Sequence, residues 1–176
     1  MDIKLLSLDE NISYGDEILN MLELCDKEFV PPLSLRSSTT QSDLKSKEEN
    51  KNGVKSYFDE VIKQHLMVAT ENEKLLGFVS FKENFTNDKI SENELPDIYI
   101  STLIVHPEGR GRGLTKKMYK ILFDEYKDAN IFTRTWSLNT AHIKILKEFG
   151  FEIFSIIEND RGEGIDTVYF IKKATK

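Results

Sequence analysis

The sequence contains few features that would set it apart from ordinary globular proteins. It has one cysteine in 176 residues, so no internal disulfide can form. No apolar run approaches the roughly 18 residues that span a bilayer, and the N-terminus lacks a signal-peptide pattern. Basic residues are not in surplus, because the net charge is −6, which argues against general nucleic-acid binding and weakly favours a cationic substrate. We therefore expect one cytoplasmic domain over residues 1–176, with no nucleic-acid or membrane partner.

Few side chains suggest metal or thiol chemistry. His65 and His106 have no second ligand at a metal-binding spacing, which predicts no metal site. Cys25 continues the apolar stripe of a predicted helix that carries Ile18 and Leu22. We therefore expect Cys25 in the core and not as a nucleophile.

Hydrophobic periodicity divides the chain into strands and helices. The pattern predicts strands at 3–8, 66–70, 75–81, 97–105, 131–137, 151–157 and 165–172, and helices at 16–29, 54–64, 112–126 and 139–150. The fourth strand is apolar on both faces, Ile98, Ile100, Thr102 and Ile104 on one and Tyr99, Ser101, Leu103 and Val105 on the other, so we expect it to be central. A helix and another strand follow it, an order that predicts a parallel right-handed crossover.

A turn rich in glycine and arginine joins the central strand to the next helix. The stretch 110–117 carries four cations and no acid, namely Arg110, Arg112, Lys116 and Lys117. A helix N-terminus is already positive, so cations gathered there favour the binding of a polyanion. The turn is not a P-loop, because no Gly-Lys-Ser/Thr closes it, and its glycines do not complete a dinucleotide fingerprint.

This segment resembles motif A of the GNAT N-acetyltransferase superfamily. Val105-His106-Pro107 and the run from Arg110 to Thr115 occupy the places of Val-x-Pro and Arg/Gln-x-x-Gly-x-Gly/Ala, with Thr115 replacing the usual small residue. The next unit of the family also fits, because Asn139 and Gly150-Phe151 stand at the expected distances. The resemblance implies a single α/β domain with a mixed, mostly antiparallel twisted sheet, helices on its sides and a splayed parallel strand pair at its centre.

The resemblance further implies that acetyl-coenzyme A binds as the acetyl donor. Its pantetheine arm would lie along the backbone of the central strand, and its pyrophosphate would sit on N–H groups at the helix start. The implied coenzyme-binding residues are Leu103, Ile104, Val105, Arg110, Gly111, Arg112, Gly113, Leu114, Thr115, Lys116, Asn139 and His142.

Two positions depart from the family pattern. The tyrosine that usually protonates the leaving thiolate is replaced by Leu146, and the alanine one turn earlier is replaced by His142. The two positions are four apart and share one helix face. Either His142 replaces the tyrosine as general acid or contacts the coenzyme, or it is a surface histidine near a helix start.

An ammonium acceptor must lose a proton before it attacks a thioester, with or without a water relay. The candidate bases are Asp97, Glu94 and Tyr99 around the start of the central strand, and Glu83 at the end of the preceding strand. The catalytic candidates are Asp97, Tyr99 and His142. Arg134 either holds a substrate carboxylate, pairs with an acid or stacks on Trp136.

These observations predict an acyltransferase that moves an acetyl group from acetyl-coenzyme A to a primary amine by direct attack in a ternary complex. One alternative is a non-catalytic coenzyme-binding or regulatory module, suggested by the missing tyrosine. Another is a phosphate- or nucleotide-binding protein of a different kind. The acceptor stays open between a small metabolite, an antibiotic, a peptide N-terminus and a protein lysine, and the chain is expected as a monomer or homodimer.

Overall fold

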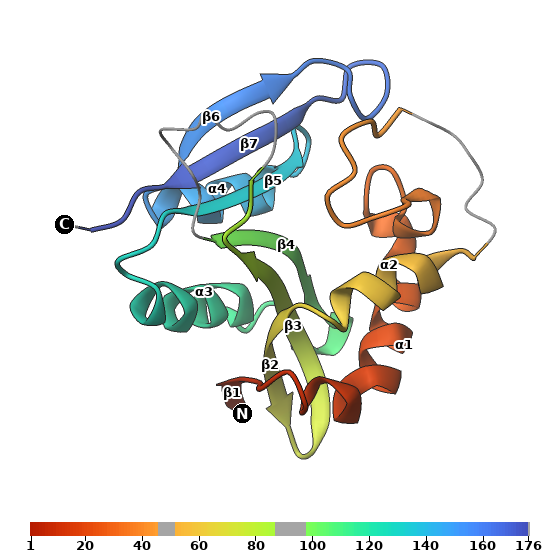
Figure 1. Ribbon diagram of the computed structural model, residues 1–176, viewed down its shortest axis with the longest axis vertical. Helices are drawn as coiled ribbons and strands as arrows, with labels where there is room; N and C mark the ends of the chain where they lie inside the picture. Colours follow the sequence, from red (N-terminus) through yellow and green to blue (C-terminus); the bar gives the residue numbers. More distant parts are fainter. Residues whose placement is uncertain (46–51, 87–97, 176) are drawn as a thin grey trace.

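The computed structural model describes residues 1–45, 52–86 and 98–175 (Figure 1). In chain order it contains β1 (Asp2–Leu5), α1 (Gly15–Cys25), α2 (Val54–Val61), β2 (His65–Glu71), β3 (Lys74–Glu83), β4 (Ile98–Val105), α3 (Leu114–Glu125), β5 (Ile131–Trp136), α4 (Thr140–Glu148), β6 (Glu152–Ile157) and β7 (Thr167–Lys172). Each predicted strand and helix has a counterpart, with shifted ends. Within the described residues, no helix is long and apolar enough to cross a membrane.

The first helix ends earlier than its apolar stripe predicts. α1 stops at Cys25 and a 3-10 turn, η2 (Asp26–Glu28), follows it. The Asp26 carboxylate accepts hydrogen bonds from the backbone N–H of Ser34 at 2.7 Å and from the Ser34 hydroxyl at 2.8 Å. These bonds tie the end of the helix to the chain beyond the two prolines, so the backbone turns before it reaches Phe29.

One seven-stranded sheet organises the protein, in the order β1-β2-β3-β4-β5-β7-β6. All neighbouring pairs are antiparallel except β4 and β5, which are parallel and joined through α3. The predicted hairpins β2–β3 and β6–β7 and the predicted parallel crossover are confirmed. The mixed, mostly antiparallel sheet with a central parallel pair confirms the expected fold class.

The central pair separates soon after it forms. β4 pairs with β5 only from Ile98 to Ile100, although both strands continue beyond that point. The Thr133 hydroxyl donates to the carbonyl of Ile100 at 3.1 Å, where the backbone ladder ends. The two strands therefore splay apart, and the edge of β4 beyond Ile100 faces a gap in the sheet.

A β-bulge in β4 corrects the expected alternation of its side chains. Phe81 on β3 pairs with Ile100, whereas Ser80 pairs with Thr102, so Ser101 is an extra residue without a partner. The extra residue exchanges the two faces of the strand. Ile98 and Ile100 pack into one core, whereas Ile104 packs into the other, so the prediction that these isoleucines share a face was wrong.

Two apolar cores cover the two faces of the sheet. The helices α3 and α4 lie on one side of the sheet, and α1 and α2 lie on the other (Figure 1). Side chains of α3 and α4, including Met118, Leu122 and Leu146, pack on one face. Side chains of α1 and α2, including Leu22 and Val61, pack on the other. β4 contributes to both cores and therefore fixes the gap relative to all four helices.

Candidate functional site

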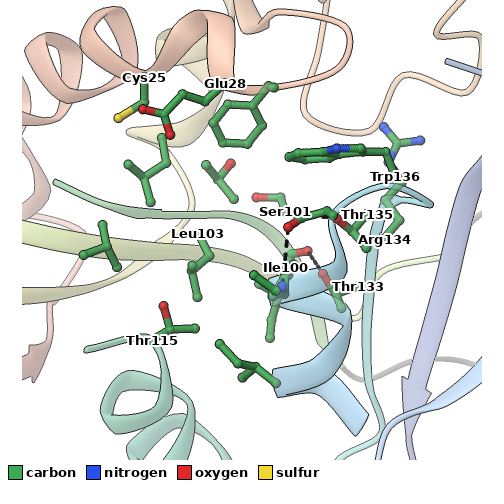
Figure 2. Close-up of a pocket in the computed structure, with 18 of the residues that line it drawn as sticks. Cys25, Glu28, Ile100, Ser101, Leu103, Thr115, Thr133, Arg134, Thr135 and Trp136 are labelled. Carbon is green, nitrogen blue, oxygen red and sulfur yellow. Dashed lines mark hydrogen bonds between the residues drawn. The ribbon is translucent and has the colours of Figure 1, made fainter. Parts of the chain in front are cut away.

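A cavity of about 370 Å³ lies where β4 and β5 splay apart. Figure 2 shows Cys25 and Glu28 descending toward β4 from one side, Thr115 of α3 on the opposite side, and Trp136 at the end of β5. The cavity is lined by Cys25, Glu28, Phe29, Arg36, Ile100, Ser101, Thr102, Leu103, Ile104, Val105, Arg110, Thr115, Tyr119, Thr133, Arg134, Thr135, Trp136, Asn139, Ala141, His142, Ile145 and Arg161. Most of the residues expected to bind the coenzyme are therefore brought together here.

The edge of β4 offers backbone groups to this cavity. The N–H of His106 donates to the carbonyl of Leu76 on β3 at 2.9 Å. Because successive peptide groups of a strand point to opposite sides, the N–H and C=O of Val105 and Leu103 point into the gap. The Arg110 Nε donates to the Val105 carbonyl at 3.1 Å, which agrees with that direction.

The Gly-Arg turn leads into α3 with two left-handed glycines. Gly111 and Gly113 both have φ of +71°, a conformation that strains residues with a Cβ. Helix α3 begins directly afterwards at Leu114, and the first N–H groups of any helix have no partner within the helix. Thr115 in this first turn lines the cavity. The turn thus presents backbone donors at the positive end of the α3 dipole.

Three of the four cations in this stretch, Arg110, Arg112 and Lys116, are held by acids from three other elements. Arg110 donates to both oxygens of Glu28, at 2.9 and 2.8 Å. Arg112 likewise binds Glu71 at 3.0 and 2.6 Å, and the hydrogen bond to Arg112 lowers the pKa of Glu71. All these side chains are substantially exposed, so each pair is weak and can exchange its partner.

Lys116 is engaged in the same way. Its Nζ lies 2.5 Å from a carboxylate oxygen of Glu148 on α4, and this hydrogen bond lowers the pKa of Glu148. The pair links the first turn of α3 to the last turn of α4.

His142 lies at the wall of the cavity, bonded to a residue that the sequence did not single out. Its Nε2 is 2.7 Å from the hydroxyl oxygen of Tyr119 on α3, and both residues line the cavity. Desolvation by burial lowers the pKa of His142 to about 4 and raises the pKa of Tyr119 above its usual range. At neutral pH the imidazole is therefore uncharged, and the phenol keeps its proton.

The start of α4 explains how His142 is placed. The Asn139 side chain caps the helix by accepting from the His142 N–H at 3.4 Å, and its amide donates to the Thr135 hydroxyl at 3.0 Å. Leu146, one turn further, is fully buried in the core that α3 and α4 share. The position to which the resemblance assigned a tyrosine thus holds a core side chain, and the phenol of Tyr119 on α3 lies beside His142.

Of the predicted bases, the two that the structure describes, Tyr99 and Glu83, do not line this cavity. Tyr99 is 2% exposed, stacks on Phe85 with ring centroids 4.4 Å apart, and has a pKa raised by burial, so we assign it no role as base. Glu83 accepts a hydrogen bond from Tyr126 at 3.0 Å and borders another hollow near His65. Asp97 and Glu94 lie outside the described residues.

Cys25 is 1% exposed within the core under α1, as its periodicity predicted. It also touches the cavity, where an Nη of Arg110 lies 3.7 Å from its sulfur. Burial raises the pKa of its thiol, so Cys25 is not poised as a nucleophile.

Aromatic and basic side chains form the end of the cavity beyond Ser101. The rings of Phe29 and Trp136 lie 5.9 Å apart between their centroids. Arg36 stands 5.5 Å from the centre of the Phe29 ring, and Arg161 stands 5.8 Å from that of Trp136. Arg134 and Trp136 lie on the same strand, as the sequence indicated, and the pairing of β5 with β7 brings Arg161 beside Trp136.

Comparisons with known proteins agree with this arrangement. The model of the Acetyltransferase (GNAT) family matches residues 31–151. No curated protein matches the sequence. Among solved structures, the chain is similar to the aminoglycoside 6'-N-acetyltransferase from Enterococcus faecium (13% identity, 100% of this chain and 98% of that chain, TM-score 0.67).

Two further structures share the fold. One is an aminoglycoside 6'-N-acetyltransferase complexed with coenzyme A, at 12% identity, with 100% of this chain and 98% of that chain covered and a TM-score of 0.67. The other is the ribosomal-protein-alanine N-acetyltransferase from Brucella melitensis, at 14% identity, with 98% and 99% covered and a TM-score of 0.63. At these identities, the likeness shows the fold alone.

Proposed function

Because the chain belongs to the acetyltransferase (GNAT) family, we propose that it transfers an acetyl group from acetyl-coenzyme A to a primary amine by direct attack in a ternary complex. One observation carries the proposal. The cavity joins the unpaired edge of β4 to the first turn of α3, so one ligand can contact the strand backbone and the helix N-terminus together.

The coenzyme binds with its pyrophosphate on the N–H groups of the Gly-Arg turn and α3. Arg110 and Lys116 exchange their carboxylate partners for phosphate oxygens. The pantetheine amides pair with the Leu103 and Val105 backbone, as a short extra strand would. This brings the thioester to the point where β4 and β5 separate.

The reaction forms a C–N bond and an S–H bond, and it breaks the C–S bond of the thioester and one N–H bond of the amine. The neutral amine nitrogen attacks the thioester carbon, and a backbone N–H of β4 stabilises the negative charge that develops on the carbonyl oxygen. The C–S bond then breaks, and the sulfur leaves with the electron pair as a thiolate. The proton of the attacking amine leaves through water to Asp97, which directly precedes β4 in sequence.

Tyr119 supplies the proton that the thiolate takes up. His142 is neutral, and in the tautomer with hydrogen on Nε2 it donates to the phenol oxygen and leaves the hydroxyl hydrogen free for the sulfur. A hydrogen bond to the phenol oxygen also stabilises the phenolate that forms briefly. Asp97 releases its proton to water, and the phenolate takes one up from water, which restores both groups. The contribution is modest, because a thiol with a pKa near 8.5 leaves readily.

Mass spectrometry of an amine panel incubated with the protein and acetyl-coenzyme A tests the proposal. We expect acetylated product and stoichiometric free thiol in at least one reaction, and none when the coenzyme lacks its acetyl group. Coenzyme binding without acetylation of any amine would favour the non-catalytic module. A thermal shift with nucleotides and none with acetyl-coenzyme A would favour the phosphate-binding alternative.

A further inference from the structure

Two arginines bring buried positive charge to the end of the cavity that lies beyond Ser101. Arg134 stands on β5, and Arg161 stands in the turn between β6 and β7, where it is 6% exposed. The register of the sheet explains why they meet. Arg134 pairs with Tyr169, and Trp136 pairs with Thr167, the residue that holds Arg161.

Arg134 has hydrogen-bonding capacity that the described residues do not use. Its Nη1 donates to the Tyr169 hydroxyl at 3.2 Å. Its Nη2 is buried and has no hydrogen-bond partner within residues 1–45, 52–86 and 98–175. A buried donor without an acceptor is destabilising, so this nitrogen is suited to an acceptor that arrives with a ligand.

Hydrogen bonds hold Arg161 in place, but among the described residues no ion pair neutralises its charge. Its Nε donates to the Thr167 hydroxyl at 2.9 Å and its Nη1 to the Val30 carbonyl at 2.6 Å. In the described part of the chain neither Arg134 nor Arg161 forms a salt bridge, although Asp160 next in sequence partly offsets the charge. Burial, together with the charges of Arg36 and Arg134, lowers the pKa of Arg161 to about 9.

A purely structural role explains only part of this arrangement. The bonds of Arg161 to Val30 and Thr167 fasten the β6–β7 turn to the segment after α1. They do not explain why Arg36, Arg134 and Arg161 gather at one cavity, or why a nitrogen of Arg134 has no partner among the described residues. A guanidinium fork fits a carboxylate with two parallel hydrogen bonds, and an anion there would also offset the repulsion.

We propose that the acetyl acceptor carries a carboxylate, which Arg134 and Arg161 bind while its amine reaches the gap between β4 and β5. This inference rests on the proposed function and names the substrate class of the same site. It replaces the weak expectation of a cationic acceptor, which came from the net charge of −6.

The first test of the carboxylate preference uses the wild-type protein. Wild-type protein and acetyl-coenzyme A are incubated with amino acids, β-amino acids and their carboxamides, so that each pair differs only in the carboxylate. We expect kcat/KM to be about ten- to a hundredfold higher for the carboxylates, the range of a charge-assisted pair. A preference for the carboxamides or for diamines would overturn the inference and leave acetyl transfer standing. Aminoalkylphosphonates form a further arm, and their preference over carboxylates would overturn the choice of carboxylate.

Arg134→Gln then locates the preference. We expect this variant to lose most of its preference for carboxylates over the matching carboxamides, with Arg134→Lys in between. Lys120→Gln removes an exposed charge of α3 outside the cavity and serves as the matched control. Selectivity retained in a folded Arg134→Gln variant would overturn the assignment.

Direct binding separates failure of the inference from failure of the proposed function. The same amines are titrated by NMR into protein saturated with coenzyme A. Binding of the carboxylates without acetylation of any amine would support the arginine site and refute the transferase. If other amines are acetylated but the carboxylates neither bind nor react, the transferase is supported and the arginine site is refuted.

Discussion

The hydroxyl oxygen of Tyr119 lies 2.7 Å from Nε2 of His142, which joins α3 to α4 at the wall of the cavity. His142 lies one turn before Leu146, the position to which the sequence pattern assigned the tyrosine of the family. Burial lowers the pKa of His142 and raises the pKa of Tyr119, so at pH 7 the imidazole is neutral and the phenol keeps its proton. Although Leu146 takes the place of the tyrosine of the pattern, a phenol, that of Tyr119, still lies beside His142.

Replacing Tyr119 with phenylalanine tests the proton donor. We expect kcat to fall by about tenfold, below the usual range for general acids because a thiolate leaves readily. The KM for acetyl-coenzyme A should change little. Tyr126→Phe is the matched control, since its hydroxyl contacts Glu83 away from the cavity. Steady-state kinetics would contradict the role if both variants kept the wild-type kcat.

His142 makes stability depend on pH. Its pKa falls from 6.5 to about 4 on folding, so the unfolded chain binds more protons between these values. Stability is therefore fully present above pH 6.5 and is lost as the pH falls through about 4, by on the order of 3 kcal/mol. Urea unfolding of wild type and His142→Gln from pH 7.5 to 4.5 measures this. Parallel curves for the two proteins would show that His142 does not titrate as described.

The ion pair between Arg110 and Glu28 is expected to compete with the coenzyme. In Glu28→Gln the guanidinium is released toward phosphate, so the Kd for coenzyme A should fall about two- to fivefold, as an exposed pair allows. Asp124→Asn, which breaks an exposed pair on α3, is the control. Weaker binding by Glu28→Gln in calorimetry would mean that the pair organises the site instead.

Removing the Arg110 side chain should weaken the coenzyme complex. We expect Arg110→Ala to raise the Kd about tenfold at low salt, with a smaller effect at high salt as the charges are screened. Lys120→Ala removes a neighbouring cation whose side chain is 71% exposed, and it should leave the Kd unchanged. An effect of Arg110→Ala that does not vary with salt would indicate a packing role.

Much of the fold could be predicted because its signals are local. The apolar spacing of helices, the turns of two hairpins and the order of β4, α3 and β5 all lie within short segments. The bulge at Ser101 could not be predicted, since an extra residue in a uniformly apolar strand leaves the alternation pattern looking regular. The first helix was overextended for a similar reason, because the bonds of Asp26 to Ser34 span a proline turn.

The residues of the candidate site likewise fall into those that could be predicted from the sequence and those that could not. The strand edge and the Gly-Arg turn are contiguous in sequence, so their residues could be named in advance. Tyr119 was missed because it sits on the apolar face of its helix and becomes a polar group of the cavity only through His142. Arg134 and Arg161 are 27 positions apart in the numbering and meet only through the pairing of β5 with β7.

Because of the bulge at Ser101, β4 contributes side chains to the apolar cores on both faces of the sheet. Before it, the isoleucines belong to the core of α3 and α4, and after it Ile104 belongs to the core of α1 and α2. A void opened in either core removes support from the same few peptide groups that border the cavity. Core substitutions far from the site should therefore have the same effect whichever face of the sheet they lie on. Each should weaken coenzyme binding before it unfolds the protein.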